Sequence, residues 1–254
     1  MTILSVKADH YRIPLGVTLS DATHGEMSSF EFVTVRLETD SGLEGVGFTY
    51  TTGAGGAAIR SLIERELMPV LVDSDEGRTE QLWQQMWWRL HYAGRGGPAS
   101  FAISAVDIAL WDLKARRHEL PLWRFLGGHN PRVPAYAGGI DLQFPMDQLR
   151  RQTESNLEKG FRAIKMKVGR PRLSEDLERV EAMRAMLGND IPLMVDANMR
   201  WSADEAIRAA RAMAEFDVFW GNYFQSGSQF GLKVQKARMR STQETISLDM
   251  ALMM

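Results

Sequence analysis

Apolar and polar residues follow two different periods along the 254-residue chain, and the period changes near residue 130. Before that point, apolar residues alternate with polar ones at 30–38 and 43–50, on either side of Ser41-Gly42, which predicts a β-hairpin. Residues 3–14 resemble a further strand, and 16–27 is a polar stretch that we expect to be a loop. Helical periods are found at 57–71, 79–90 and 100–117. We therefore expect an N-terminal α+β domain over residues 1–130.

After residue 130 the pattern becomes a strand–helix alternation. A strand pattern at 133–139 is followed by a helix at 146–159, and Ser202-x-x-Glu205 resembles a capping box that opens a later helix. Between them lie strand patterns at 163–169 and 191–198, separated by a helix at 174–187. Strands joined by helices are parallel neighbours in one sheet. Residues 131–220 thus predict three and a half βα units of an α/β domain, and 221–254 form an atypical tail.

Two lysines interrupt a strand that should be buried. Lys165 and Lys167 share one face of the strand, because side chains alternate with a period of two. Asp196 and Asn198 form the corresponding pair in the next strand. They lie at its C-terminal end, where α/β proteins have their catalytic and ligand-binding residues. Two other interpretations stay open: the lysines could be solvated on an edge strand, and Asp196 could only cap a turn.

Composition excludes several classes of protein. The formal net charge of −2 lacks the positive excess that is typical of nucleic-acid-binding proteins. The absence of cysteine excludes disulfides and thiolate metal sites. No apolar run is long enough to span a bilayer, and the N-terminus has a strand pattern, so we expect no membrane partner and a cytoplasmic location. The tryptophans on helical faces, Trp83, Trp87, Trp88 and Trp111, are expected in the core.

The Lys-x-Lys pattern at 165–167 and Val-Asp-Ala-Asn at 195–198 resemble the enolase superfamily, in its mandelate racemase/muconate lactonizing enzyme branch. The helix at 105–116, followed by Pro121-Leu122 and Leu126-Gly127-Gly128, resembles the same family. The resemblance implies a capping domain and a (β/α)8 barrel, here incomplete. It also implies that Lys167 transfers a proton at the carbon next to a carboxylate, that Lys165 binds the carboxylate and lowers the pKa of Lys167, and that Asp196 is the first of three Mg²⁺ ligands. Asn198 is a further candidate for binding substrate.

The hairpin at 42–48 and the glycine-rich stretch after it resemble the acid-sugar dehydratases, above all those of galactarate and talarate. In such enzymes the loops corresponding to 16–27 and 49–56 close over the substrate. The implied reaction is Mg²⁺-dependent removal of the proton α to the carboxylate of a sugar acid, followed by β-elimination of water. Racemisation or epimerisation begins with the same step and is the alternative chemistry.

The resemblance stops after Trp220. The family continues with Trp-x-Glu-Glu-Pro, whose first glutamate is the second Mg²⁺ ligand, whereas this chain has Asn222 at that position. The third glutamate and the partner histidine have no counterpart either, since all the histidines precede residue 133: His10, His24, His91, His118 and His129. We therefore expect a truncated or altered chain with weak or no Mg²⁺ binding, little turnover, and self-association or homo-oligomers through open sheet edges. The competing hypothesis is a non-catalytic fragment that acts as an interaction partner.

Overall fold

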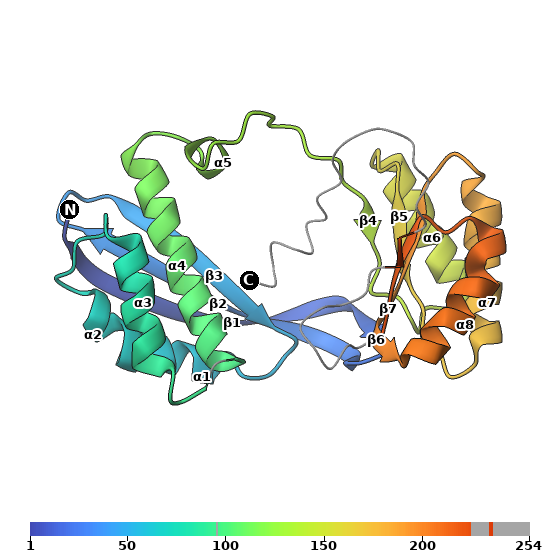
Figure 1. Cartoon of the computed structure of the whole chain (residues 1–254), viewed down its shortest axis with the longest axis horizontal. Coiled ribbons are helices and arrows are strands. Elements are labelled where there is room, and N and C mark those ends of the chain that lie inside the picture. The colour runs from blue at the N-terminus through green and yellow to red at the C-terminus, as the bar shows by residue number, and fades with distance from the viewer. Residues whose placement is uncertain (95, 225–233, 236–254) are drawn as a thin grey trace. The chain divides into compact units, whose positions relative to one another are not determined.

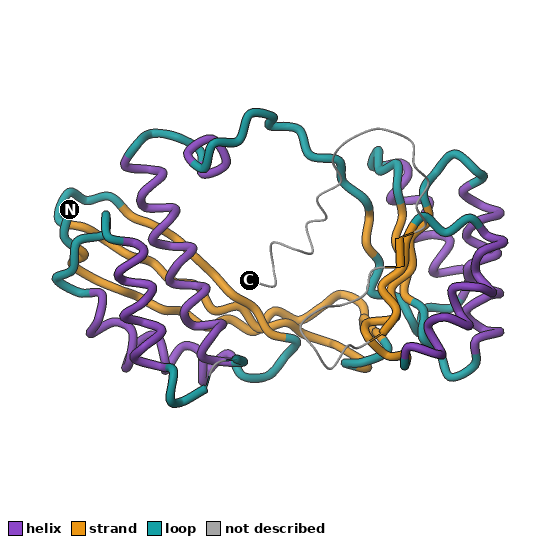
Figure 2. The backbone as a smooth tube through the Cα atoms, in the orientation of Figure 1, coloured by secondary structure: helices purple, strands orange, loops and turns teal. Residues whose placement is uncertain are grey.

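The computed structural model describes residues 1–94, 96–224 and 234–235, and these form two compact units. Within the described residues, the first unit comprises 1–16 and 28–132. The second comprises 17–27 together with the described residues from 133 onwards. Figure 2 traces the strands and helices of each unit along the chain.

The first unit is built on a three-stranded sheet in the order β1 (Ile3–Asp21), β2 (Gly25–Thr39) and β3 (Glu44–Thr51). The end of β1 and the start of β2, within residues 17–27, belong to the second unit. β2 and β3 pair antiparallel, which confirms the predicted hairpin. The predicted loop at 16–27 is wrong for most of its length, because β1 continues to Asp21 and β2 begins at Gly25. Backbone hydrogen bonds of Ser20 with residues 140 and 142 hold this extension, and the local residue pattern carries no trace of such long-range bonds.

The helices of the first unit occupy nearly the predicted ranges. They are α1 (Gly56–Leu62), α2 (Met68–Leu71), α3 (Thr79–Leu90), α4 (Pro98–Arg117) and α5 (Leu122–Phe125). The single helix predicted at 57–71 is interrupted by a π-helical turn at Ile63–Leu67. Pro69 follows this turn, and a proline ring clashes with the carbonyl four residues earlier, so the wider turn relieves that clash.

Helix α4 packs directly on the backbone of β3 (Figure 1). A Cβ atom on Gly47 would lie 2.0 Å from the Ala105 carbonyl oxygen, and one on Gly45 would lie 2.3 Å from that of Ala109. Glycine at both positions therefore lets helix and strand approach more closely than any side chain would allow.

Of the four tryptophans predicted in the core, only Trp87 packs against it, and Trp111 is half-buried outside the core cluster. Trp83 and Trp88 are 42% and 62% exposed, so the prediction is wrong for them. Helix α3 turns Leu82, Met86 and Leu90 inward instead. Aromatic residues on several faces of one helix cannot all reach one core.

The second unit contains a five-stranded sheet in the order β4-β5-β6-β7-β8. Its elements are β4 (Ala137–Gly138), α6 (Met146–Glu158), β5 (Ile164–Lys167), α7 (Leu173–Leu187), β6 (Leu193–Trp201), α8 (Ala203–Met213), a 3₁₀ turn (Ala214–Phe216), β7 (Trp220–Phe224) and β8 (Val234–Gln235). Strands β4 to β7 are parallel, which confirms the βα alternation, while β8 is antiparallel to β7. The first strand is shorter than predicted, and Pro134 cannot donate a backbone hydrogen bond there. The predicted capping box, Ser202 with Glu205, opens α8.

The core of the second unit lies between the sheet and helices α6, α7 and α8, which cover one face of it (Figure 1). Ile164, Met166 and Val168 belong to this core, as their alternation with the lysines predicted. None of the described helices combines the length and the apolar character that a membrane crossing requires.

Candidate active site

The two lysines of β5 meet the aspartate of β6 at the C-terminal end of the parallel sheet. Lys167 pairs in register with Asp196, and its Nζ lies 2.7 Å from Asp196 Oδ2. Lys165 Nζ lies 3.3 Å from the same oxygen and 5.3 Å from the centre of the Tyr136 ring. The structure thus brings together the three charged residues that the sequence singled out. Their catalytic roles remain predictions.

The burial of the two lysines excludes the interpretation that they are solvated on an edge strand. Lys165, Lys167 and Asp196 are 8%, 5% and 5% exposed, and β5 lies between β4 and β6. Burial by itself would raise the pKa of the Asp196 carboxyl, but the ammonium groups of Lys167 and Lys165 outweigh it and lower that pKa. Asp196 also has the predicted turn role, because Oδ1 accepts a hydrogen bond of 2.9 Å from the backbone N–H of Asn198. The two interpretations of Asp196 are therefore compatible.

Asn198 lies where β6 departs from regular geometry. It and Met199 have positive φ angles, 46° and 60°, and the pairing with β7 shifts between Asp196 and Arg200. The side-chain oxygen of Asn198 is buried and has no hydrogen-bond partner among the described residues. A buried acceptor without a donor is costly, so this oxygen suits a ligand that donates a hydrogen bond.

Residues 17–27 lie across the C-terminal ends of β4, β5 and β6. Ser20 exchanges backbone hydrogen bonds with residues 140 and 142, Ala22 approaches Gly169, and the Thr23 hydroxyl donates to the Asn198 carbonyl. The His24 ring is held by its Nδ1, 2.8 Å from Asp21 Oδ2. Burial would raise the pKa of Asp21, yet hydrogen bonds from the His24 backbone and ring lower it overall. A role for this segment in closing over substrate stays a prediction.

The other segment predicted to close over the substrate, residues 49–56, lies in the first unit. It joins the end of β3 to the start of α1, and the Glu31 carboxylate accepts hydrogen bonds from the Gly56 backbone N–H at 2.8 Å and the Thr51 hydroxyl at 3.1 Å. The hydrogen bond from the Gly56 N–H, with that from Thr51, lowers the pKa of Glu31 against burial, which would raise it. The carboxylate therefore fixes the end of the segment that leads into the helix.

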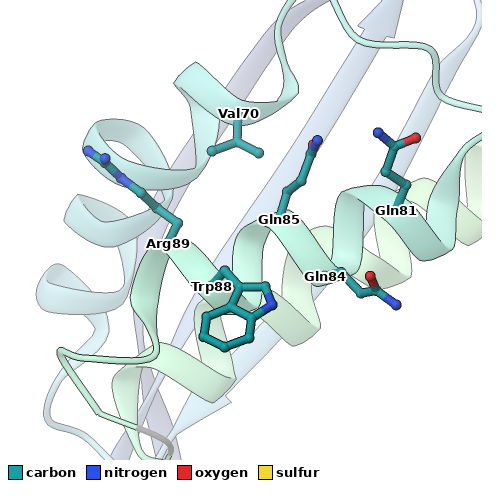
Figure 3. A pocket seen from close by; sticks show the side chains of 6 residues that line it. All are labelled: Val70, Gln81, Gln84, Gln85, Trp88 and Arg89. Carbon is teal, nitrogen blue, oxygen red and sulfur yellow. The ribbon is translucent and has the colours of Figure 1, made fainter.

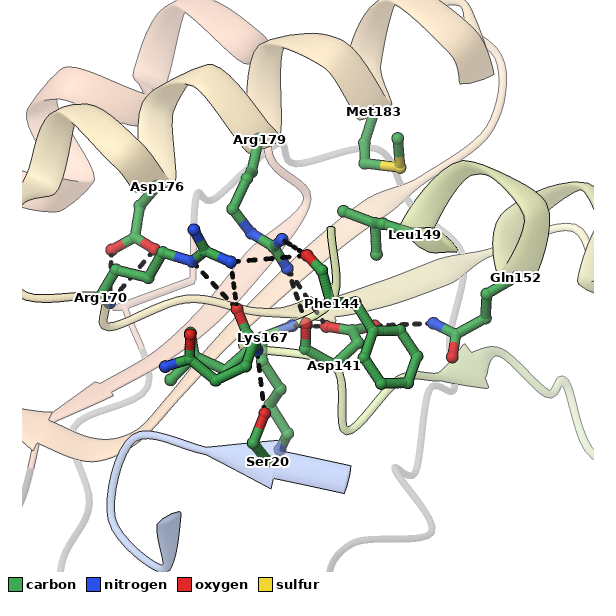
Figure 4. A network of polar contacts seen from close by, with 12 residues as sticks. Ser20, Asp141, Phe144, Leu149, Gln152, Lys167, Arg170, Asp176, Arg179 and Met183 are labelled. Carbon is green, nitrogen blue, oxygen red and sulfur yellow. Dashed lines mark hydrogen bonds and ion pairs between the residues drawn. The ribbon is translucent and has the colours of Figure 1, made fainter. Parts of the chain in front are cut away.

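Beneath β5 lies a buried polar network that sequence reasoning missed (Figure 4). Asp141 and Arg179 are almost inaccessible, as is Asp176, which accepts hydrogen bonds from the backbone N–H groups of Gly169 and Arg170. A signal was present, because Asp176 and Arg179 fall on the face of α7 that also carries Val180, Met183 and Leu187. Charged residues within an apolar helical stripe indicate buried polar interactions.

The described residues do not by themselves make a Mg²⁺ site. No cluster of three histidine, aspartate or glutamate residues capable of holding a metal occurs among them. Asp196 offers one carboxylate, and both of its oxygens already accept hydrogen bonds. Asn222, at the position of the family's second ligand, is in register with Asp196 through its backbone. Magnesium in proteins prefers octahedral oxygen ligands with at least one or two free carboxylates, which this set does not supply.

A hollow of about 420 Å³ on the first unit offers no comparable chemistry (Figure 3). Its only charged side chain is that of Arg89, which is paired with Glu66 at 2.8 Å. The remaining lining residues are Val70, Gln81, Gln84, Gln85 and Trp88. It holds no acid or base that could move a proton.

Two family models match the chain and together cover most of it. Residues 6–127 match the mandelate racemase/muconate lactonizing enzyme N-terminal domain, and residues 148–221 match the enolase C-terminal domain-like family. The chain belongs to the mandelate racemase/muconate lactonizing enzyme branch of the enolase superfamily. The predicted family is therefore confirmed, as is the fold class of an N-terminal α+β capping domain followed by a β/α barrel domain.

The chain is similar in sequence to characterised members of the superfamily. The chain is 57% identical over 215 residues to 3,6-anhydro-α-L-galactonate cycloisomerase of Streptomyces coelicolor, covering 85% of this chain and 60% of the relative. It is 37% identical to L-talarate/galactarate dehydratase of Salmonella typhimurium, covering 82% of this chain and 54% of the relative. The chain thus spans little more than half the length of these relatives.

Solved structures agree. A racemase from Streptomyces coelicolor A3(2) with bound magnesium has a TM-score of 0.85 at 57% identity, covering 86% of this chain and 61% of that one. L-Talarate dehydratase from Polaromonas sp. JS666, complexed with magnesium and L-glucarate, has a TM-score of 0.80 at 36% identity, with coverages of 87% and 60%. Magnesium is thus the metal of this family, and sugar acids are among its ligands.

Proposed function

We propose that this chain carries the proton-abstracting lysine pair of a sugar-acid lyase, with Lys167 as the acid/base and Lys165 as the group that binds the substrate carboxylate. The observation that supports it is the convergence of both Nζ atoms on the buried Asp196 carboxylate. Asn198 is proposed as a further substrate contact, because its side-chain oxygen is buried without a partner among the described residues. Magnesium supplies electrophilic stabilisation in this family, and we propose that it binds this chain weakly or not at all.

The proposed step breaks the bond between the α-carbon of the sugar acid and its hydrogen. The proton goes to Lys167 Nζ, and the electron pair moves into the carboxylate to give an enediolate. Because Nζ is 2.7 Å from Asp196 Oδ2, this ion pair must open, and Nζ must lose its extra proton, before the lysine can act as a base. Lys165 remains positive and balances the charge that grows on the carboxylate.

The second half of the reaction depends on the leaving group. In a dehydration, the C–O bond on the β-carbon breaks, the hydroxyl leaves as water after taking a proton, and an enol remains. A 3,6-anhydro sugar acid has its ring ether oxygen at that same carbon, so the same elimination opens the ring and loses no water. The dehydratase is our principal proposal, and ring-opening isomerisation is the second, favoured by the 57% identity to a cycloisomerase.

Deuterium exchange tests the first step separately from the second. The purified chain is incubated in D₂O with excess Mg²⁺ and a panel of galactarate, L-talarate and 3,6-anhydro-L-galactonate, alongside Lys167→Ala. We expect little product from the 254-residue chain, and any loss of the α-proton signal should disappear in the variant. Exchange that persists in Lys167→Ala contradicts the role of Lys167. If neither protein exchanges the α-proton, the result favours a non-catalytic fragment.

We also propose that the chain self-associates. Within the described residues, β4 pairs only with β5 and β8 only with β7, so the sheet of the second unit is open at both edges. Unpaired edge strands promote association with further strands. Sedimentation velocity across a concentration series tests this, and a single monomeric species at all concentrations contradicts it.

A further inference from the structure

The backbone ladder between β4 and β5 ends just before Lys167. β4 pairs through Ala137 and Gly138 alone, and the last ladder bond runs from the Gly139 N–H to the Lys165 carbonyl at 2.9 Å. The N–H of Lys167 points toward the β4 side, as alternate residues of a strand do. There it meets a side chain, because Asp141 Oδ1 accepts its hydrogen bond at 2.9 Å.

The Asp141 carboxylate is fixed from more than one direction (Figure 4). Gln152 Nε2 donates to Oδ2 at 2.7 Å. The Arg179 guanidinium donates to the Asp141 backbone carbonyl at 2.9 Å and to the Phe144 carbonyl at 2.8 Å, and lies 3.7 Å from Oδ1. Both charged side chains are almost inaccessible, with exposures of 0% and 3%. A carboxylate held this way has a single position available to it.

Gly139 leaves the room that this carboxylate needs. A Cβ atom at residue 139 would lie 1.7 Å from Asp141 Oδ2 and 2.8 Å from Gln152 Nε2. Any side chain at this position must therefore displace the carboxylate. The same turn is attached to residues 17–27, because the Ser20 hydroxyl accepts from the Gln143 N–H at 2.9 Å.

We propose that Asp141 is a positioning residue for Lys167, a role that rests on the proposed function of that lysine. Its carboxylate takes the place of a strand carbonyl and holds the backbone of Lys167, so that the Lys167 ammonium group is directed at Asp196. Gln152 and Arg179 keep the carboxylate in place, and Gly139 makes the space.

A purely structural role is the alternative: Asp141 and Arg179 would then contribute only a buried ion pair to folding. The two roles predict different results at Lys167. Asp141→Ala removes the acceptor. Asp141→Asn removes the charge but keeps an oxygen that can accept from the Lys167 N–H. Gly139→Ala keeps Asp141 and displaces it. The exposed Asp147, whose partner is Arg151 at 2.7 Å on α6, provides Asp147→Asn as a matched control.

The experiment uses the 254-residue chain and needs no turnover. Amide hydrogen exchange at Lys167 is measured by NMR relative to Met166, and the rate at which Lys167 Nζ reacts with an amine reagent is followed by mass spectrometry over a pH series. We expect Asp141→Ala and Gly139→Ala to speed exchange at Lys167 by at least about tenfold relative to Met166 and to shift the pH profile of labelling. Asp141→Asn should restore most of the protection, and Asp147→Asn should match the parent.

The proposal is overturned if Asp141→Ala or Gly139→Ala lowers the unfolding midpoint while exchange and labelling at Lys167 stay as in the parent. It is also overturned if Asp141→Asn loses protection as fully as Asp141→Ala, since charge rather than hydrogen bonding would then be what matters. If Asp141→Ala does not fold, the other two variants decide. Because neither readout involves a sugar acid, failure of the proposed proton transfer would leave this result intact.

Discussion

Lys167 Nζ and Asp196 Oδ2 lie 2.7 Å apart, and both side chains are almost fully buried. Lys165 approaches the same oxygen at 3.3 Å, so a single carboxylate balances two ammonium groups. Removing a charge from such a cluster leaves the others in a low-dielectric environment without compensation, which costs more than the cluster contributes as a whole.

We therefore expect Asp196→Asn to lower the free energy of unfolding by about 3–5 kcal/mol. In the double variant Lys167→Met/Asp196→Asn the loss should be smaller than the sum of the two single losses, because the second change removes a charge that the first has left unpaired. Urea unfolding of the four proteins measures this. Additive losses would show that the two groups do not interact in the folded chain.

Asp176 should make stability depend on pH. Burial raises its pKa from 3.8 to about 6, although hydrogen bonds from Gly169 and Arg170 oppose the rise. The folded chain therefore binds a proton more tightly than the unfolded chain, so this contribution is present below pH 4 and is lost as the pH rises to 6. Asp176→Asn cannot ionise and therefore does not lose this contribution. The unfolding free energy of the variant, relative to that of the parent, should rise by about 2–3 kcal/mol as the pH increases over this range. Urea unfolding at several pH values should show this gain, whereas a constant difference would contradict the raised pKa.

Gly47→Ala should be among the most destabilising small substitutions in the first unit. Its Cβ would lie 2.0 Å from the Ala105 carbonyl oxygen and 2.6 Å from the Ala109 nitrogen, both backbone atoms that cannot rotate away. We expect a loss of about 3 kcal/mol or more in unfolding free energy, or failure to fold. Gly16→Ala is the control, since nothing lies within 4 Å of its added Cβ, and thermal melts of the two variants should differ clearly.

Met199 should tolerate glycine and reject a branched residue. Its φ of 60° is a left-handed conformation that costs most side chains about 1–2 kcal/mol, and the side chain is 39% exposed, so little packing is lost by removing it. Met199→Gly is expected to leave the unfolding free energy unchanged or to raise it by up to about 1 kcal/mol. Met199→Val should lower it by about 1–2 kcal/mol. Equal effects of the two substitutions in urea unfolding would rule out backbone strain at this residue.

The sequence predicted those parts of the fold in which each segment has a single period. The hairpin around Ser41-Gly42 and helix α3 have their predicted places, as do β5 and α7, because alternation or a helical stripe is sufficient to define them. The convergence of Lys165 and Lys167 on Asp196 was predictable for a similar reason, since the register of parallel strands brings their C-terminal ends together.

What the sequence could not predict depends on long-range contacts. Residues 17–27 have no clear period, and their strands are fixed by bonds from Ser20 to a turn more than a hundred residues later. Asp141 shows the same limit. An aspartate after a short strand predicts a turn, and nothing local indicates that its carboxylate completes the hydrogen bonding of Lys167, 26 residues further along the chain. Asp176 and Arg179 were different, because their positions within the apolar face of α7 were visible in the sequence.

The second unit is not a continuous stretch of sequence, since residues 17–27 belong to it while the residues on either side belong to the first unit. A gene fragment that starts at Val133 would therefore encode a sheet without Ser20, and the backbone groups of residues 140 and 142 would lose their bonding partners. Dissecting this protein at residue 132, the obvious position for a cut, would separate two polypeptides of which the second is incomplete. Supplying the missing hairpin in trans, as a peptide covering residues 17–27, should restore part of its stability.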